Sequence, residues 1–187
     1  MNAFIVESNP NREYYLQKLI RTHFEMEKEI IDLLKQKACT KQDVYRKTQS
    51  VFADLQKLLK AKASNLTKKI ASKDKCVKVL YSSKGKFEAQ LKFSGDTLVF
   101  HMHSNVFDFP SKHEIHKTKY VKEDNLRSFC GVIHVYNFLS DSLKYNRMND
   151  EGYLIGRIFI NKDSHFFVEG DKQLGFLFND FVNQRIN

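Results

Sequence analysis

The sequence has few cysteines, and they lie far apart. Cys39, Cys76 and Cys130 form no CxxC pair, which argues against a disulfide framework and against a structural zinc ribbon. No apolar run approaches the roughly 20 residues that a membrane-spanning helix needs. The opening stretch, MNAFIVESNPNREYY, has no basic segment and too short an apolar run for a secretory signal. We therefore expect a cytoplasmic protein without a membrane span.

The sequence also lacks the common catalytic and phosphate-binding motifs. It contains no GxSxG nucleophile elbow, no GxxxxGK[ST] phosphate loop and no HExxH metal motif. No nucleophile can be matched with a base on spacing alone. The sequence thus favours a binding protein over an enzyme, and we expect no cofactor.

Glycine is missing from the first part of the chain. All seven glycines lie at or after Gly85, and thirteen of the sixteen phenylalanines lie at or after Phe87. A glycine-free part rich in Lys, Leu and Gln favours helix, and a part rich in Phe, Val and Ile favours strands. We predict an α+β fold, in which an N-terminal antiparallel helical hairpin precedes an antiparallel sheet of five to seven strands with a short helix after Pro110. We divide the chain into residues 1–75 and 76–187, and we expect them to form one compact unit.

The first part reads as two helices. Apolar residues recur at helical spacing over residues 16–34 and again over residues 44–66. The pattern breaks at residues 38–40, and Thr40 followed by Asp43 is a capping-box signal for a second helix. This predicts a turn between two antiparallel helices, a hairpin that could also join two copies of the chain as a homodimer.

Positive charge is concentrated in the second of these helices. The net charge is +9, and residues 38–75 hold ten basic and three acidic residues, which gives +7 for this segment. Basic residues cover the arc opposite the apolar arc, namely Arg46, Lys57, Lys60 and Lys68. Such a surface can neutralise the phosphates of nucleic acid or a ribonucleoprotein, or meet an acidic protein surface. The alternative is a solvated face that keeps the protein soluble.

One of the predicted strands carries two histidines, His101 and His103. If a four-residue turn places Phe93 opposite Leu98, Glu88 faces His103 on the polar side, beside His101. Two imidazoles and a carboxylate could hold a zinc or iron ion. The alternative, which we favour, is an ordinary polar strand face with a cross-strand charge pair.

Two later strands predict an aromatic and basic sheet face. Alternation over residues 132–139 and 153–160 places one group of side chains on the side away from the core, namely His134, Tyr136, Tyr153, Arg157 and Phe159. This face could bind a small ligand in a sensory or regulatory domain that dimerises through its helices. The alternative is that the helices cover it, as layered folds require. Segment 174–182 fits strand or helix equally well.

Overall fold

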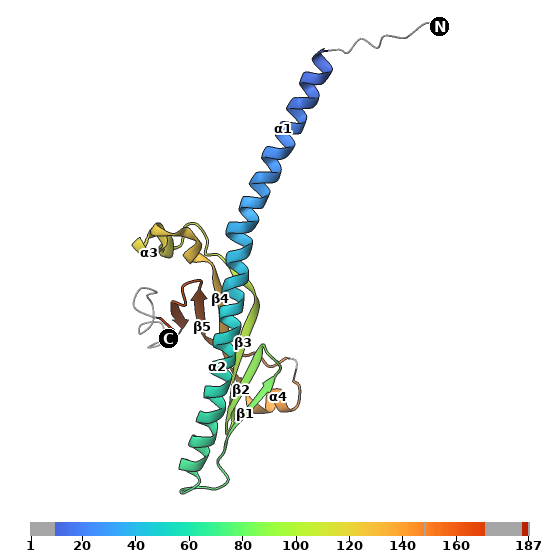
Figure 1. Ribbon diagram of the computed structural model, residues 1–187. Coiled ribbons are helices and arrows are strands. Elements are labelled where there is room, and N and C mark those ends of the chain that lie inside the picture. Colours follow the sequence, from blue (N-terminus) through green and yellow to red (C-terminus); the bar gives the residue numbers. More distant parts are fainter. Residues whose placement is uncertain (1–9, 148, 171–184, 187) are drawn as a thin grey trace, which may run out of the picture. The chain divides into compact units, whose positions relative to one another are not determined.

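The computed structural model describes residues 10–147, 149–170 and 185–186, and its elements make an α+β protein (Figure 1). Helices come first in the chain and an antiparallel sheet follows, which confirms the predicted fold class. Segment 174–182 lies outside the described residues.

The chain forms two compact units that divide after Cys39. The first unit holds α1 (Pro10–Leu33) and a π-helical turn, η1 (Leu34–Ala38). The second unit holds α2 (Cys39–Ile70), apart from its first residue, and the whole sheet. The composition of the sequence changes near residue 75, but α2 belongs with the sheet because its apolar side chains pack against the strands.

The backbone is helical where the break in the apolar pattern predicts a turn. Leu33 and Cys39, on either side of η1, have right-handed helical dihedral angles, with φ of −61° and −62°. The Cys39 N–H donates to the Leu34 carbonyl, which is the five-residue step of a π-helix. No glycine or proline interrupts this stretch, and the π-helical turn accommodates the change of phase in the apolar pattern. The antiparallel helical hairpin is therefore unconfirmed.

Within the described residues the sheet has six strands, in the order in which they occur in the chain, and each neighbouring pair is antiparallel. The strands are β1 (Val79–Lys84), β2 (Glu88–Phe93), β3 (Asp96–Phe107), β4 (Cys130–Leu139), β5 (Tyr153–Asn161) and β6 (Phe166–Gly170). The short helices are η2 (Glu114–Lys117), α3 (Lys119–Glu123) and η3 (Asn125–Ser128) before β4, and α4 (Ser140–Lys144) after it. The predicted number of strands and the short helix after Pro110 are confirmed.

The turn between β2 and β3 contains two residues, Ser94 and Gly95, so Phe93 pairs with Asp96. Ser94 adopts a φ of +51°, the left-handed conformation found in tight turns. The predicted pairing of Phe93 with Leu98 is wrong by two residues, because it assumes a longer turn. A shift of two residues keeps every side chain on its own face of the sheet but changes its cross-strand partner.

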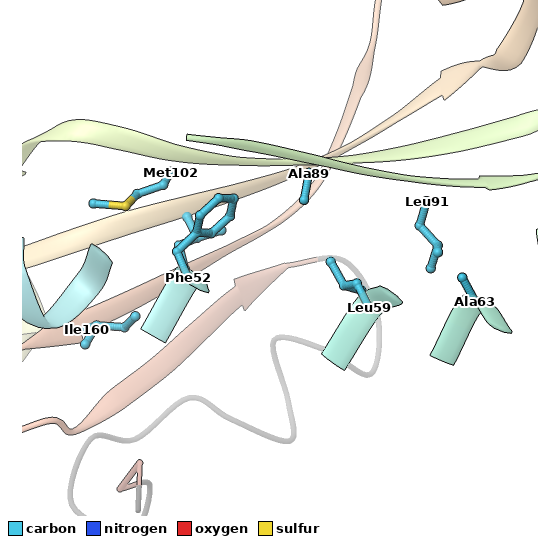
Figure 2. Close-up of a cluster of buried hydrophobic side chains, with 8 residues drawn as sticks. Phe52, Leu59, Ala63, Ala89, Leu91, Met102 and Ile160 are labelled. Atoms are coloured by element: carbon cyan, nitrogen blue, oxygen red, sulfur yellow. The ribbon is translucent and has the colours of Figure 1, made fainter. Parts of the chain in front are cut away.

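One stripe of α2 and one face of the sheet form the main hydrophobic core (Figure 2). Phe52, Leu59 and Ala63 of α2 point toward the sheet, at spacings that keep them on one side of the helix. The strands contribute alternate residues that face α2, namely Ala89, Leu91, Met102, Ile133 and Ile160. The residues between them point to the other face of the sheet, which α2 does not cover.

Thr48 of α2 packs directly against Gly131 of β4. Thr48 is fully buried, and its hydroxyl donates to the Val44 carbonyl one turn earlier in the helix at 2.8 Å. A Cβ atom on Gly131 would overlap the Thr48 side chain, with the Thr48 Cβ 2.7 Å away and its Cγ2 2.8 Å away. A glycine at residue 131 is therefore a packing requirement of the helix–sheet contact.

We expect Gly131→Ala to lower the free energy of unfolding by about 1–3 kcal/mol, the usual cost of adding a methyl group to a packed core. Urea denaturation followed by circular dichroism measures the change. Gly95→Ala is the matched control, because a Cβ atom there meets no atom within 4 Å. Equal stability of the two variants would contradict the close contact.

Candidate functional site

The exposed side of α2 carries the basic residues that the sequence assigns to a polyanion. All four are exposed, on the side of the helix away from its buried residues, namely Arg46, Lys57, Lys60 and Lys68. Arg46 lies 2.5 Å from Asp43, and Lys57 lies 2.8 Å from Asp54. These exposed pairs add little stability, but they neutralise two of the four predicted charges.

Two further lysines add to the positive charge near the end of α2. Lys62 and Lys69 fall at the edge of the apolar arc in the sequence, yet both side chains are exposed. α2 contains eight basic and two acidic residues, and the acidic ones are those already paired with Arg46 and Lys57. Four exposed lysines of α2 have no acidic residue near them along the helix, namely Lys60, Lys62, Lys68 and Lys69. We call them the α2 lysine cluster.

The sheet face opposite α2 carries a row of charged and imidazole side chains. The row crosses β2 to β6 through successive cross-strand pairs, and its members in strand order are Glu88, His101, His134, Arg157 and Glu169. Arg157 Nη1 lies 3.4 Å from the Glu169 carboxylate. Sequence alternation predicts which residues share this face, but the row itself depends on the register.

The candidate metal site at Glu88, His101 and His103 is not assembled. Glu88 pairs with His101 instead of His103. His103 Nδ1 accepts a hydrogen bond from the Asn105 N–H, and its ring packs on Phe107 with centroids 4.6 Å apart. Over the part of the chain that the structure describes, no three potential metal ligands gather.

The structure brings together part of the predicted ligand face. Three of its five residues line one groove on this side of the sheet, namely His134, Arg157 and Phe159. Tyr136 and Tyr153 are not among the lining residues. A register shift in β5 places Leu154 opposite Tyr136, so Tyr153 pairs with Asn137. Tyr153 therefore lies on the other face from the one that simple alternation predicts, because a bulge interrupts β5.

The groove has a volume of about 240 Å³. Its floor consists of two adjacent pairs from β4 and β5, Val132 with Phe159 and His134 with Arg157. Its wall is residues 107–110, where the chain leaves β3. No local motif in the sequence marks this wall, because the segment comes to lie beside β5 only through the order of the strands.

A separate polar cluster joins the short helices to the β5–β6 turn. Asn161 is fully buried, and its Oδ1 accepts the N–H groups of Asp163 and His165 while its Nδ2 donates to the Tyr120 hydroxyl at 3.0 Å. Arg127 donates to Asp163 at 2.9 Å and lies over the Tyr120 ring. Burial raises the pKa of Tyr120 to about 12. These groups satisfy one another, so we assign the cluster to stability.

No family model, curated protein or solved structure matches this chain. Its function must therefore be argued from the geometry of its two surfaces, the α2 lysine cluster and the groove. None of the helices within the described ranges is long and apolar enough to cross a membrane.

His134 lies in the middle of the row, and its pKa is below the ordinary value of 6.5. Burial is the main cause, and repulsion from Arg157, His103 and His101 adds to it. The folded protein therefore favours the neutral imidazole, whereas the unfolded chain binds a proton near pH 6.5. The stability that this residue contributes is present above pH 6.5 and is lost as the pH falls through the lowered pKa.

We expect Arg157→Gln to raise the pKa of His134, because the substitution removes a nearby positive charge. NMR titration of the imidazole C–H resonances measures this pKa. Glu169→Gln is the control, since removing the partner of Arg157 leaves the guanidinium in place and should not raise the pKa. A pKa of His134 that is the same with and without Arg157 would contradict the coupling.

Proposed function

We propose that this chain is a non-enzymatic, cytoplasmic binding protein whose α2 lysine cluster engages nucleic acid, alone or within a ribonucleoprotein. One observation carries the proposal: the end of α2 exposes four lysines and no acidic residue. Exposed cations attract the phosphate backbone, and binding releases the counterions condensed on it. Affinity of this kind depends on salt more than on base sequence.

The rigidity of α2 supports the proposal. The side of the helix opposite to Lys60 and Lys68 packs on the sheet through Phe52, Leu59 and Ala63, so the backbone that carries the lysines is held in place. Lys60 and Lys68 are eight helical steps apart, a rise of about 12 Å, which matches three to four nucleotide steps of about 3.4 Å. Fixed charges at this spacing can contact phosphates that lie three to four nucleotides apart on one strand.

We expect the double substitution Lys60→Gln and Lys68→Gln to weaken oligonucleotide binding and to reduce the slope of log affinity against log salt by about two. Fluorescence anisotropy of a labelled oligonucleotide over a salt series measures both quantities. The matched control is Lys119→Gln with Lys122→Gln, which removes the same charge from exposed positions of α3. The control should keep the wild-type slope.

A wild-type salt slope in the Lys60 and Lys68 variant would contradict nucleic-acid binding at α2. Pull-down from cell extract with and without nuclease separates the other partner class. A partner that survives nuclease treatment but is lost from the variant would replace nucleic acid by an acidic protein surface.

The apolar side chains of α1 favour a second copy of the chain as a further partner. α1 exposes many large apolar residues, among them Leu16, Leu19, Phe24, Met26 and Ile30. Leu16, Leu19, Met26, Ile30 and Leu33 fit alternate spacings of three and four residues, with His23 at the remaining position, which is typical of a helix–helix seam. A single helix with such a stripe is marginal in water, so association with another helix stabilises it.

The charges of α1 favour an antiparallel pairing of the two copies. Residues 10–21 contain three basic and one acidic residue, whereas residues 22–33 contain one basic and four acidic residues. Antiparallel pairing brings the basic half of each helix beside the acidic half of the other. Parallel pairing would place like charges together.

We expect Leu19→Glu to raise the dissociation constant of this dimer on the order of a hundredfold, because it buries an unpaired charge in the seam. Light scattering over a concentration series measures the constant. Gln17→Glu adds the same charge on the polar side of α1 and should leave the dimer intact. A wild-type protein that stays monomeric at all concentrations would contradict the homodimer.

A further inference from the structure

The groove on the sheet face opposite α2 has an aromatic part and a charged part. Phe159 lies in the floor, and Phe107 and Phe109 lie in the wall. The Phe109 ring lies 5.2 Å from Phe159 and 5.7 Å from Phe167, centroid to centroid, and Phe159 stacks on Phe167. The aromatic part is therefore backed by further rings and presents a firm apolar surface.

The wall is held in place by the short helices that follow it. A ring nitrogen of His116, Nε2, lies 3.1 Å from the Phe109 carbonyl oxygen, within hydrogen-bond distance. The Ser128 hydroxyl donates to Asp108 Oδ1 at 2.6 Å. Both contacts hold the segment in place. Binding of a ligand therefore costs little conformational entropy in the wall.

Arg157 and His134 form the charged part of the groove. Among the described residues, Arg157 forms an ion pair with Glu169 through Nη1 at 3.4 Å. This pair does not use the N–H groups of Nε and Nη2, which can donate to a ligand. A planar guanidinium fork matches a carboxylate. The neutral imidazole of His134, on the paired position of β4, offers one further N–H donor.

We propose that the groove binds a small aromatic monocarboxylate, with its ring against Phe107, Phe109 and Phe159 and its carboxylate at Arg157 and His134. The volume of about 240 Å³ equals about eight water molecules of ~30 Å³ each, which suits a single ring with one substituent. Asp108 also lines the groove, and its charge disfavours a second anionic group on the ligand. This activity is separate from nucleic-acid binding by α2 and goes beyond it.

The test uses benzoate as the probe and benzamide as its neutral isostere, with the full-length protein observed by NMR. We expect benzoate to shift the amide signals of Val132, His134, Arg157 and Phe159 in a saturable way, with a dissociation constant on the order of 1 mM. Benzamide should bind about tenfold more weakly or worse, because it lacks the charge that pairs with the guanidinium.

Arg157→Gln should weaken benzoate binding about tenfold or more. Arg147→Gln is the matched control, since it removes the same charge from an exposed residue outside the groove. Phe107→Ala tests the aromatic part at a residue that is 40% exposed, and it should weaken the binding of benzoate and of benzamide alike.

Three results would overturn the proposal: no saturable shifts up to about 20 mM benzoate, equal affinity for benzoate and benzamide, or unchanged benzoate binding by Arg157→Gln. Oligonucleotide binding by Arg157→Gln should equal that of the wild type. Loss of benzoate binding alone therefore leaves the role of α2 standing, and loss of oligonucleotide binding alone leaves the groove standing.

Discussion

Where Thr48 meets Gly131, a helix and a strand approach more closely than any residue with a side chain at position 131 would permit. The contact holds because the buried Thr48 hydroxyl donates a hydrogen bond inside its own helix and is not left without a partner. It sets the height of α2 above the sheet. At this height Phe52 reaches Met102 and Ile160 in the core, and the basic side of the helix faces water.

Strand β4 connects the two surfaces, because its residues alternate between them. Gly131 and Ile133 face α2, whereas Val132 and His134 belong to the groove. A polyanion on the helix and a small anion in the groove would therefore lie on opposite sides of one sheet. They would not compete for the same side chains, and any coupling between them would pass through β4.

The helix-then-sheet order could be predicted because it depends on local preferences, which the distribution of glycine and phenylalanine records directly. The register of β2 against β3 could not be predicted. It depends on Ser94 adopting a left-handed backbone conformation, which is uncommon for residues other than glycine. The bulge at Ile155 had one signal, the neighbouring Gly156, since glycine inside a strand often marks a bulge. The exposure of Lys57, Lys60 and Lys68 follows from helical periodicity, whereas that of Lys62 and Lys69 does not. The wall of the groove does not, because residues 107–110 become neighbours of β5 only in the folded sheet.

The sequential order of the strands has a consequence for how the protein folds. Every described strand pairs with the one next to it in the chain. The β1–β2, β2–β3 and β5–β6 pairs close over short turns with little loop-closure entropy, whereas residues 108–129 separate β3 from β4 and residues 140–152 separate β4 from β5. The contacts of α2 are of another kind: Lys47 hydrogen-bonds the Lys162 carbonyl, 115 residues away. We therefore expect the short hairpins to form early and α2 to dock late, so that changes in the helix–sheet contact mainly alter the rate of unfolding.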